Sequence, residues 1–98
     1  MKYLSNAFSL NMLNTFENYE VKIKKLRDIE KIYNSDVVSC IGHQDLANIL
    51  NVQFNRASIM LNRGDILYVA QYIGERLPEG TKELPSGARI EFFEIEIF

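Results

Sequence analysis

The alternation of hydrophobic and polar positions predicts several strands along the chain. Residues 2–4 form a short extended segment, and residues 19–24 alternate apolar and charged side chains, which is typical of a half-buried strand. Residues 37–41 form a short apolar run that suits a buried strand. Residues 88–98 alternate again, although Phe93 interrupts the rhythm, and we expect a terminal strand there.

Two stretches have helical rather than alternating spacing. Their apolar positions are Leu10, Leu13 and Phe16 in the first stretch, and Leu46, Ile49 and Leu50 in the second. Ser9 precedes the first stretch and can cap it, because its hydroxyl can accept a free amide of the first turn. Asp45 lies in the expected first turn of the second helix. Residues 26–33 are highly charged and are compatible with a helical turn.

A turn and a long loop complete the expected architecture. Residues 57–61 and 66–71 flank Asn62-Arg63-Gly64-Asp65, which predicts a β-hairpin. Residues 74–87 hold both prolines and three of the five glycines, so we expect a loop. The whole pattern predicts an α/β fold: one domain spanning residues 1–98, with a small mixed sheet of about five to six strands and two to three short helices.

Composition narrows the function classes. The 98 residues are 47% hydrophobic and 24% charged, as in a soluble globular domain. The net charge of −2, from 11 basic and 13 acidic residues, argues against a general binder of long nucleic acids. No apolar run approaches the ~18 residues of a membrane span, and the first residues lack the apolar core of a signal peptide. We therefore expect a cytoplasmic protein without a membrane partner.

The lone cysteine, Cys40, excludes an intrachain disulfide and a cysteine-based metal site. Its neighbours Val37, Val38 and Ile41 are apolar. A buried small hydrophobic residue is the expected role, and a reactive thiol is the alternative.

Polar residues occupy two strand-to-helix junctions, at residues 5–9 and 42–45. In open α/β sheets, ligands collect beyond the carboxyl ends of strands, and the amides at helix N-termini favour phosphate. Gly42 would let the backbone approach such a ligand closely. If both junctions lie at one sheet edge, they form a floor for an anionic ligand.

The only histidine, His43, lies at the second junction. Beside a bound phosphate it could donate a proton to a leaving alkoxide, and the alternative is a half-exposed histidine that caps a helix. Arg76 and Glu79 lie in the Pro/Gly-rich loop and belong either to a solvated loop or to a lid that closes over a substrate. Arg56 could face phosphate or be an ordinary surface charge.

Taken together, these segments resemble those of a known family. The opening Ser5-Asn6-Ala7-Phe8-Ser9-Leu10-Asn11-Met12-Leu13 resembles that of the viral anti-CRISPR ring nucleases, which have small relatives on bacterial mobile elements. The segments that follow in the family's order are Ile41-Gly42-His43, Asn55-Arg56, Gln71, Arg76-Leu77-Pro78-Glu79-Gly80 and Ile90-Glu91-Phe92-Phe93-Glu94. The resemblance covers nearly the whole chain.

The resemblance implies a small α/β homodimer that degrades cyclic tetra-adenylate, the second messenger of type III CRISPR defence. Cleavage in that family needs no metal and no cofactor. A ribose 2′-hydroxyl attacks the adjacent phosphate, and the products are linear with a 2′,3′-cyclic phosphate. A virus-encoded member would act in the cytoplasm of the host cell.

The resemblance also implies roles for particular residues. His43 is the expected general acid, and Glu79 is the second catalytic group, which orients or deprotonates the nucleophile. Arg76 holds phosphate, and Ser9 lies at the reacting linkage. The remaining expected contacts to the ring are Asn6, Asn11, Arg56 and Gln71.

One segment departs from the family pattern. Residues 81–87 are short, and Pro85 discourages the helix that usually follows in the viral members. A shortened lid motivates an alternative function, a module that sequesters a cyclic nucleotide without cutting it. A protein-interaction factor of a phage or mobile element is a third possibility.

Overall fold

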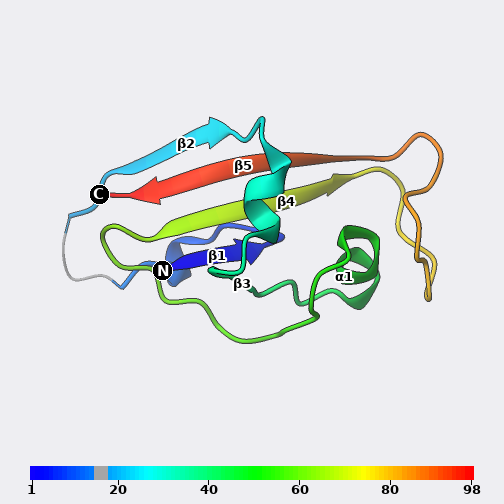
Figure 1. Cartoon of the computed structure of the whole chain (residues 1–98), viewed down its shortest axis with the longest axis horizontal. Helices are drawn as coiled ribbons and strands as arrows, with labels where there is room; N and C mark the ends of the chain where they lie inside the picture. Colours follow the sequence, from blue (N-terminus) through cyan, green and yellow to red (C-terminus); the bar gives the residue numbers. More distant parts are fainter. Residues whose placement is uncertain (15–17) are drawn as a thin grey trace.

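The computed structural model describes residues 1–14 and 18–98, which contain a five-stranded mixed sheet with strand order β2-β5-β4-β1-β3 (Figure 1). The strands are β1 Lys2–Ser5, β2 Val21–Lys25, β3 Val37–Ser39, β4 Ile66–Ile73 and β5 Arg89–Ile97. The helical elements of the described residues are α1 Gln44–Leu50 and the 3₁₀ helices η1 Leu10–Met12 and η2 Ile29–Tyr33. The predicted α/β class, strand number and short helices are confirmed.

The parallel part of the sheet positions the candidate site. β1 lies between β3 and β4 and pairs with both in parallel, whereas β5 is antiparallel to its neighbours β4 and β2. Parallel strands end at the same edge, so the carboxyl ends of β1, β3 and β4 lie together. Figure 1 shows α1 and the loop of residues 74–87 at this end of the molecule. We call it the carboxyl edge of the sheet.

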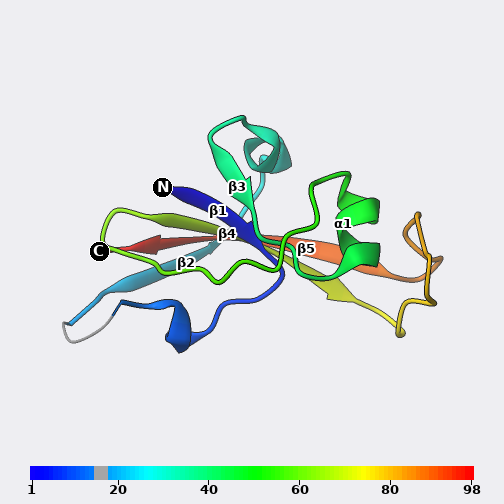
Figure 2. The same cartoon turned by 90° about the horizontal axis from the view of Figure 1, so that it is seen from below.

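The sheet is covered on both faces. α1 and η2 lie on one side of it and η1 on the other (Figure 2). In β4, Tyr68 and Ala70 belong to the core cluster on the α1 face, whereas Leu67 and Val69 belong to the cluster on the η1 face. This period of two is that of a strand buried on both sides. Burying one such leucine or valine stabilises the fold by about 1.5–3 kcal/mol.

The broken rhythm at Phe93 has the same cause. Ile90 and Phe92 pack toward the α1 face, whereas Phe93, Ile95 and Ile97 pack toward the η1 face. The pairing of β5 with β4 runs without interruption through this region. Phe92 and Phe93 therefore pack against the two different core clusters, one on each face of the sheet. The strand does not bulge between them.

The predicted β-hairpin at residues 57–71 is wrong. Residues 62–65 do form a turn, in which the Asp65 amide donates to the Asn62 carbonyl at 3.0 Å. Both edges of β4 are occupied by β1 and β5, however, so no edge remains for residues 57–61. Those residues run beside η1 instead, and Leu61 forms a parallel bridge with Leu13.

The strand predicted at residues 19–24 exists as β2, but it is not half-buried. It is an edge strand, all five of its residues are exposed, and Ile23 keeps 59% of its surface. The first predicted helix is only the three-residue 3₁₀ helix η1. Phe16, expected on its apolar face, lies outside the described residues. Within residues 1–14 and 18–98, no helix has the length and apolar character that a membrane crossing requires.

Candidate functional site

A cavity of about 300 Å³ lies at the carboxyl edge of the sheet, and four of the predicted site residues line it. Asn6 follows β1, His43 precedes α1, Gln71 lies near the end of β4, and Arg76 belongs to the loop after β4. We call this the carboxyl-edge cavity. Its other lining residues are Leu46, Tyr72, Gly74 and Leu77.

Strand register explains why these residues meet. Ser5, the last residue of β1, is paired with Val69, so β4 extends four residues beyond the end of β1. Gln71 therefore lies next to the point where Asn6 leaves the sheet. The two strand-to-helix junctions share one sheet edge, which was the condition for a common floor, since Asn6 and His43 line the same cavity.

His43 is an exposed residue that caps α1 from an extended backbone conformation. Its Nδ1 accepts a hydrogen bond from the Leu46 amide at 3.2 Å. This nitrogen therefore carries no proton, and Nε2 is the protonated nitrogen of the neutral ring. The cap also has a cost for anion binding, because the Leu46 amide is already used within the protein.

The electrostatic character of the carboxyl-edge cavity comes from one residue. Among the described residues that line it, Arg76 alone carries a formal charge at neutral pH when His43 is neutral. Amides of Asn6 and Gln71 supply further hydrogen-bond donors and acceptors. A guanidinium with neutral polar neighbours suits a phosphate group.

Glu79 does not line this cavity. It is exposed at the tip of a turn, in which the Thr81 amide donates to the Pro78 carbonyl at 3.2 Å. Gly80 occupies the position of this turn that has a positive φ, 82°. The Gly80 amide donates to Asp45 Oδ1 at 3.2 Å, which links the loop tip to the first turn of α1.

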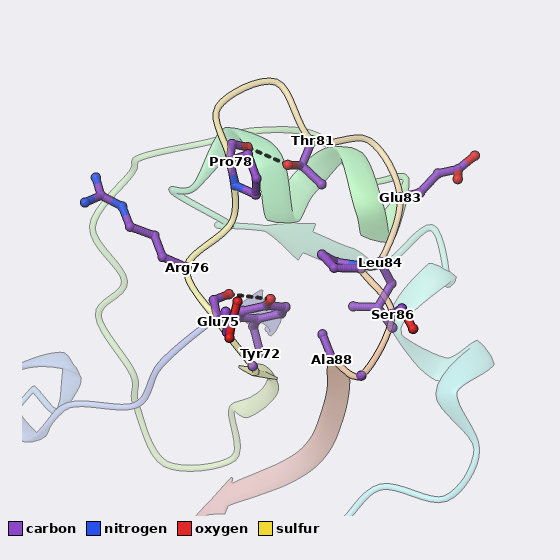
Figure 3. Close-up of a pocket in the computed structure, with 12 residues that line it drawn as sticks. Tyr72, Glu75, Arg76, Pro78, Thr81, Glu83, Leu84, Ser86 and Ala88 are labelled. Atoms are coloured by element: carbon purple, nitrogen blue, oxygen red, sulfur yellow. Dashed lines mark hydrogen bonds between the residues drawn. The ribbon is translucent and has the colours of Figure 1, made fainter.

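The loop encloses a second cavity of about 750 Å³, which we call the loop cavity (Figure 3). Tyr72, Gly74 and Arg76 line both cavities, so the two adjoin. The Tyr72 hydroxyl donates to the Glu75 carbonyl at 2.6 Å. Figure 3 shows the side chain of Arg76 extending away from the loop cavity.

The other residues expected to contact the cyclic nucleotide do not line the carboxyl-edge cavity. Ser9 caps η1, where its Oγ accepts from the Asn11 amide at 3.3 Å, so the predicted cap is confirmed. The Arg56 guanidinium lies 5.3 Å from the centre of the Phe54 ring. Its Cγ lies 3.5 Å from where a side-chain carbon of Gly42 would be. Arg56 is thus close to Gly42, the residue before His43, but does not line the cavity.

Sequence patterns missed the apolar residues of the site. Tyr72 was assigned no role, although it follows Gln71 directly in a strand that ends at the carboxyl edge. Leu46 was expected only as an apolar position of the second helix. It belongs to the core cluster between α1 and the sheet, and it also lines the carboxyl-edge cavity.

Cys40 is buried, as expected, and burial raises the pKa of its thiol. In the described part of the chain, no three His, Cys, Asp or Glu side chains gather as metal ligands would.

Comparisons with known proteins identify the family. No curated protein matches the sequence, but eleven chains of solved structures match the protein. One is B116 of Sulfolobus turreted icosahedral virus (STIV), with 26% sequence identity, a TM-score of 0.73 and 97% of each chain covered. The resemblance to a viral protein is therefore confirmed. Because the STIV B116-like family model matches residues 2–92, this chain belongs to the STIV B116-like family.

Proposed function

We propose that this protein is a metal-independent ring nuclease that cleaves cyclic tetra-adenylate and thereby antagonises type III CRISPR defence. One observation carries the proposal. Asn6, His43, Gln71 and Arg76 come from four separate segments and line one cavity. The group combines a titratable imidazole, a guanidinium and two amides. The imidazole can transfer a proton, and the guanidinium can bind the phosphate of a phosphodiester.

The proposed reaction is an internal transesterification. The ribose O2′ attacks the adjacent phosphorus, the O2′–P bond forms, and the P–O5′ bond breaks. The O2′ proton passes to a base, and the leaving O5′ receives a proton from His43. Because the nucleophile belongs to the substrate, the protein mainly aligns it with the phosphate that Arg76 holds. A well-placed general acid contributes roughly 10²–10⁴-fold to the rate.

His43 must carry a second proton before it can act as an acid. Its Nδ1 now accepts the Leu46 amide, and a protonated Nδ1 cannot. Acid catalysis therefore requires the ring to leave its capping position. A phosphate beside Arg76 favours this change, because negative charge stabilises the imidazolium.

Glu79 is the proposed base that accepts the O2′ proton, although it lies outside the carboxyl-edge cavity. The loop must therefore turn Glu79 toward the substrate, which requires release of the Gly80 amide from Asp45. A homodimer completes the proposal, since two equivalent cavities suit a symmetric ring.

A non-catalytic, sequestering module is the second candidate. The exposed position of Glu79 and the capping role of His43 favour it, because neither group is set for proton transfer in the free protein. Binding through Arg76, Asn6 and Gln71 would need neither.

Incubation with cyclic tetra-adenylate in EDTA distinguishes these functions. We expect linear products that end in 2′,3′-cyclic phosphate. His43→Asn should lower the cleavage rate by roughly 10²–10⁴-fold and leave the ring bound, since asparagine still caps a helix. Arg76→Ala should weaken binding, whereas Arg27→Ala, at an exposed arginine between β2 and η2, should change neither property.

Each alternative has its own outcome. A wild-type protein that binds the ring tightly and leaves it intact is a sequestering module. Cleavage that survives in His43→Asn removes His43 from the mechanism. A protein that does not bind the ring at all contradicts both nucleotide functions.

A further inference from the structure

One edge of the sheet is open for a further strand. β2 is the outermost strand next to β5 (Figure 1), and each of its five residues is exposed. At the opposite edge, β3 has only three residues and is partly covered by the segment that follows α1. There the Ser39 hydroxyl donates to the Gln53 carbonyl at 2.6 Å, and the Asn55 side-chain amide donates to the Ser39 carbonyl at 2.9 Å. β2 therefore forms the edge at which another chain can pair.

The pairing of β2 with β5 shows which backbone groups face outward. The Glu20 amide donates to the Phe98 carbonyl at 3.1 Å, and the Phe98 amide donates back to the Glu20 carbonyl at 2.8 Å. In an antiparallel ladder such hydrogen-bonded pairs recur at every second residue. The N–H and C=O groups of the alternate residues, Val21, Ile23 and Lys25, therefore face away from β5. These are the groups with which an added strand pairs.

The side chains of β2 differ between its two faces. Val21 and Ile23 are paired with two isoleucines of the core cluster on the η1 face, so their exposed side chains extend that apolar surface. Lys22 and Lys24 lie on the opposite face, where their partners in β5 are glutamates. Cross-strand neighbours stabilise a sheet when apolar side chains meet and when opposite charges meet. The strand that suits this edge therefore alternates apolar and acidic residues.

A hollow of about 490 Å³ with a basic lining lies at the end of β2. Its charged lining residues are the cations Lys24, Lys25, Arg27 and Lys31 and the carboxylates Asp28 and Glu94. Glu94 pairs with two of these cations, whereas Lys25 and Arg27 form no ion pair within residues 1–14 and 18–98. The excess positive charge lies where a strand added to β2 would continue, so it favours carboxylates on the partner.

We propose that the β2 edge binds an extended acidic segment of another protein as a further strand of the sheet, the mode of recognition known as β-augmentation. A second copy of this chain is disfavoured, because antiparallel pairing of two β2 strands about Ile23 sets lysine opposite lysine, and like charges directly opposite are destabilising. A nucleic acid would contact the lysines but would leave the outward backbone groups and Ile23 unused. The proposal is independent of the proposed function, since no residue of β2 lines the carboxyl-edge cavity.

Hydrogen exchange followed by NMR tests the pairing. In the free protein, the amides of Lys22 and Lys24 should exchange slowly and those of Val21, Ile23 and Lys25 quickly. A short synthetic peptide in which valine and glutamate alternate should slow exchange in the second group. A peptide in which valine and lysine alternate is the control and should leave exchange unchanged.

Two variants change the edge without removing a hydrogen bond to β5. Ile23→Pro removes an outward N–H, which an edge strand tolerates, so binding of the acidic peptide should fall at least about tenfold while circular dichroism stays unchanged. Lys22→Glu should weaken binding about fivefold, because like charges then oppose each other. Lys82→Glu makes the same change at an exposed lysine of the loop of residues 74–87 and should have no effect. Fluorescence anisotropy of the labelled peptide measures these affinities, and Lys22→Glu decides alone if Ile23→Pro does not fold.

Each other outcome overturns the proposal. If the acidic peptide does not bind, or binds without slowing exchange at Ile23, the lysines of β2 only protect the edge from aggregation. If both variants bind as tightly as wild type, the peptide binds elsewhere. If a single-stranded oligonucleotide binds at β2 and the peptide does not, the surface contacts nucleic acid. Slow exchange at Ile23 that depends on protein concentration, without peptide, would place a second copy on the edge.

Discussion

Gly74 sets the path of the chain as it leaves β4. A Cβ at this position would lie 2.8 Å from the Ala88 Cβ and 3.2 Å from the Ala88 Cα. The second of these atoms is backbone and cannot rotate away. The close approach lets the loop begin and end side by side, directly after the pairing of Ile73 with Arg89. Glycine is therefore required here by space.

We expect Gly74→Ala to force the two ends of the loop apart, at the overpacking cost of about 1–3 kcal/mol. Urea denaturation measures the loss of stability, and binding of cyclic tetra-adenylate measures the effect on both cavities that Gly74 lines. Gly42→Ala is the control, because its nearest new contact, Arg56 Cγ at 3.5 Å, is an ordinary one. Equal stability of the two variants would contradict the argument from space.

His43 is the helix cap that one of the two interpretations of its sequence position expected, and it also faces the candidate site. It caps α1 through Nδ1 and lines the carboxyl-edge cavity. The cap holds the ring in a single orientation while the protein is free. The same cap explains why His43→Ala alone would be a poor test of catalysis: it also removes a helix cap worth about 0.5–2 kcal/mol. Asparagine separates the two roles.

β2 and η2 are held against β5 through a buried carboxylate. Glu94 is only 4% exposed, and its oxygens lie 2.9 Å from Lys24 Nζ and 3.8 Å from Lys31 Nζ. The two lysines remain about half-exposed. The interaction is therefore asymmetric, since loss of Glu94 leaves solvated cations, whereas loss of both lysines leaves a buried anion without either of these ion-pair partners.

This asymmetry predicts the order of stability among variants. The double variant Lys24→Ala, Lys31→Ala should lower Tm more than Glu94→Gln does, because an uncompensated buried charge costs more than a lost surface pair. Thermal unfolding followed by circular dichroism checks this order. Lys22→Ala, at a neighbouring exposed lysine of β2, is the control for loss of a lysine side chain alone. The reverse order would mean that the lysines do not compensate Glu94.

The same contact predicts a pH dependence. A hydrogen bond and the charge of Glu94 raise the pKa of Lys24 above its usual 10.5. A raised folded-state pKa gives stability that is complete below 10.5 and is lost as the pH rises through the raised value. The stability difference between wild type and Glu94→Gln should thus be constant near neutrality and shrink above pH 10.5. Urea midpoints across this range measure it.

Over the whole molecule, sequence patterns predicted individual strands and helices, which depend on local order. They missed the pairing of segments that are distant in sequence. Alternation located β2 and β5, and helical spacing located α1, because each pattern reports one element. The hairpin failed because residues 57–61 and β4 both find partners far away in sequence, at Leu13 and at β1 and β5. The sequence pattern within residues 57–71 does not indicate those partners.

The candidate site shows the same division. Whether Asn6 and His43 meet was left open in the sequence, and they do so because strand ends of a parallel sheet share an edge. Gln71 and Arg76 line the same cavity. The position of Glu79 depends on the turn of residues 78–81 and its link to Asp45, which no sequence pattern contains. The loop cavity likewise arises only when the ends of β4 and β5 are brought together.

Cys40 offers a measure of how the molecule opens as a whole. It is 8% exposed in the core cluster on the η1 face, directly after β3, and burial raises the pKa of its thiol above the usual 9.0. Both effects reduce attack by a thiol reagent, because the thiolate is the reactive form and the reagent must reach it. Modification should therefore proceed through opened molecules.

We expect the native thiol to react at least roughly a hundredfold more slowly than the thiol of the urea-unfolded chain, with the rate rising as urea approaches the unfolding midpoint. A Cys40→Ala, Met60→Cys variant is the control, since position 60 is 52% exposed and should react at once in native buffer. If Cys40 reacts as fast as that exposed thiol, the end of β3 opens without global unfolding. Since β3 leads directly into His43, such local opening would place the least stable part of the sheet beside the candidate site. Agreement between the rates of modification and of unfolding would instead mean that the carboxyl edge is as stable as the core beneath it.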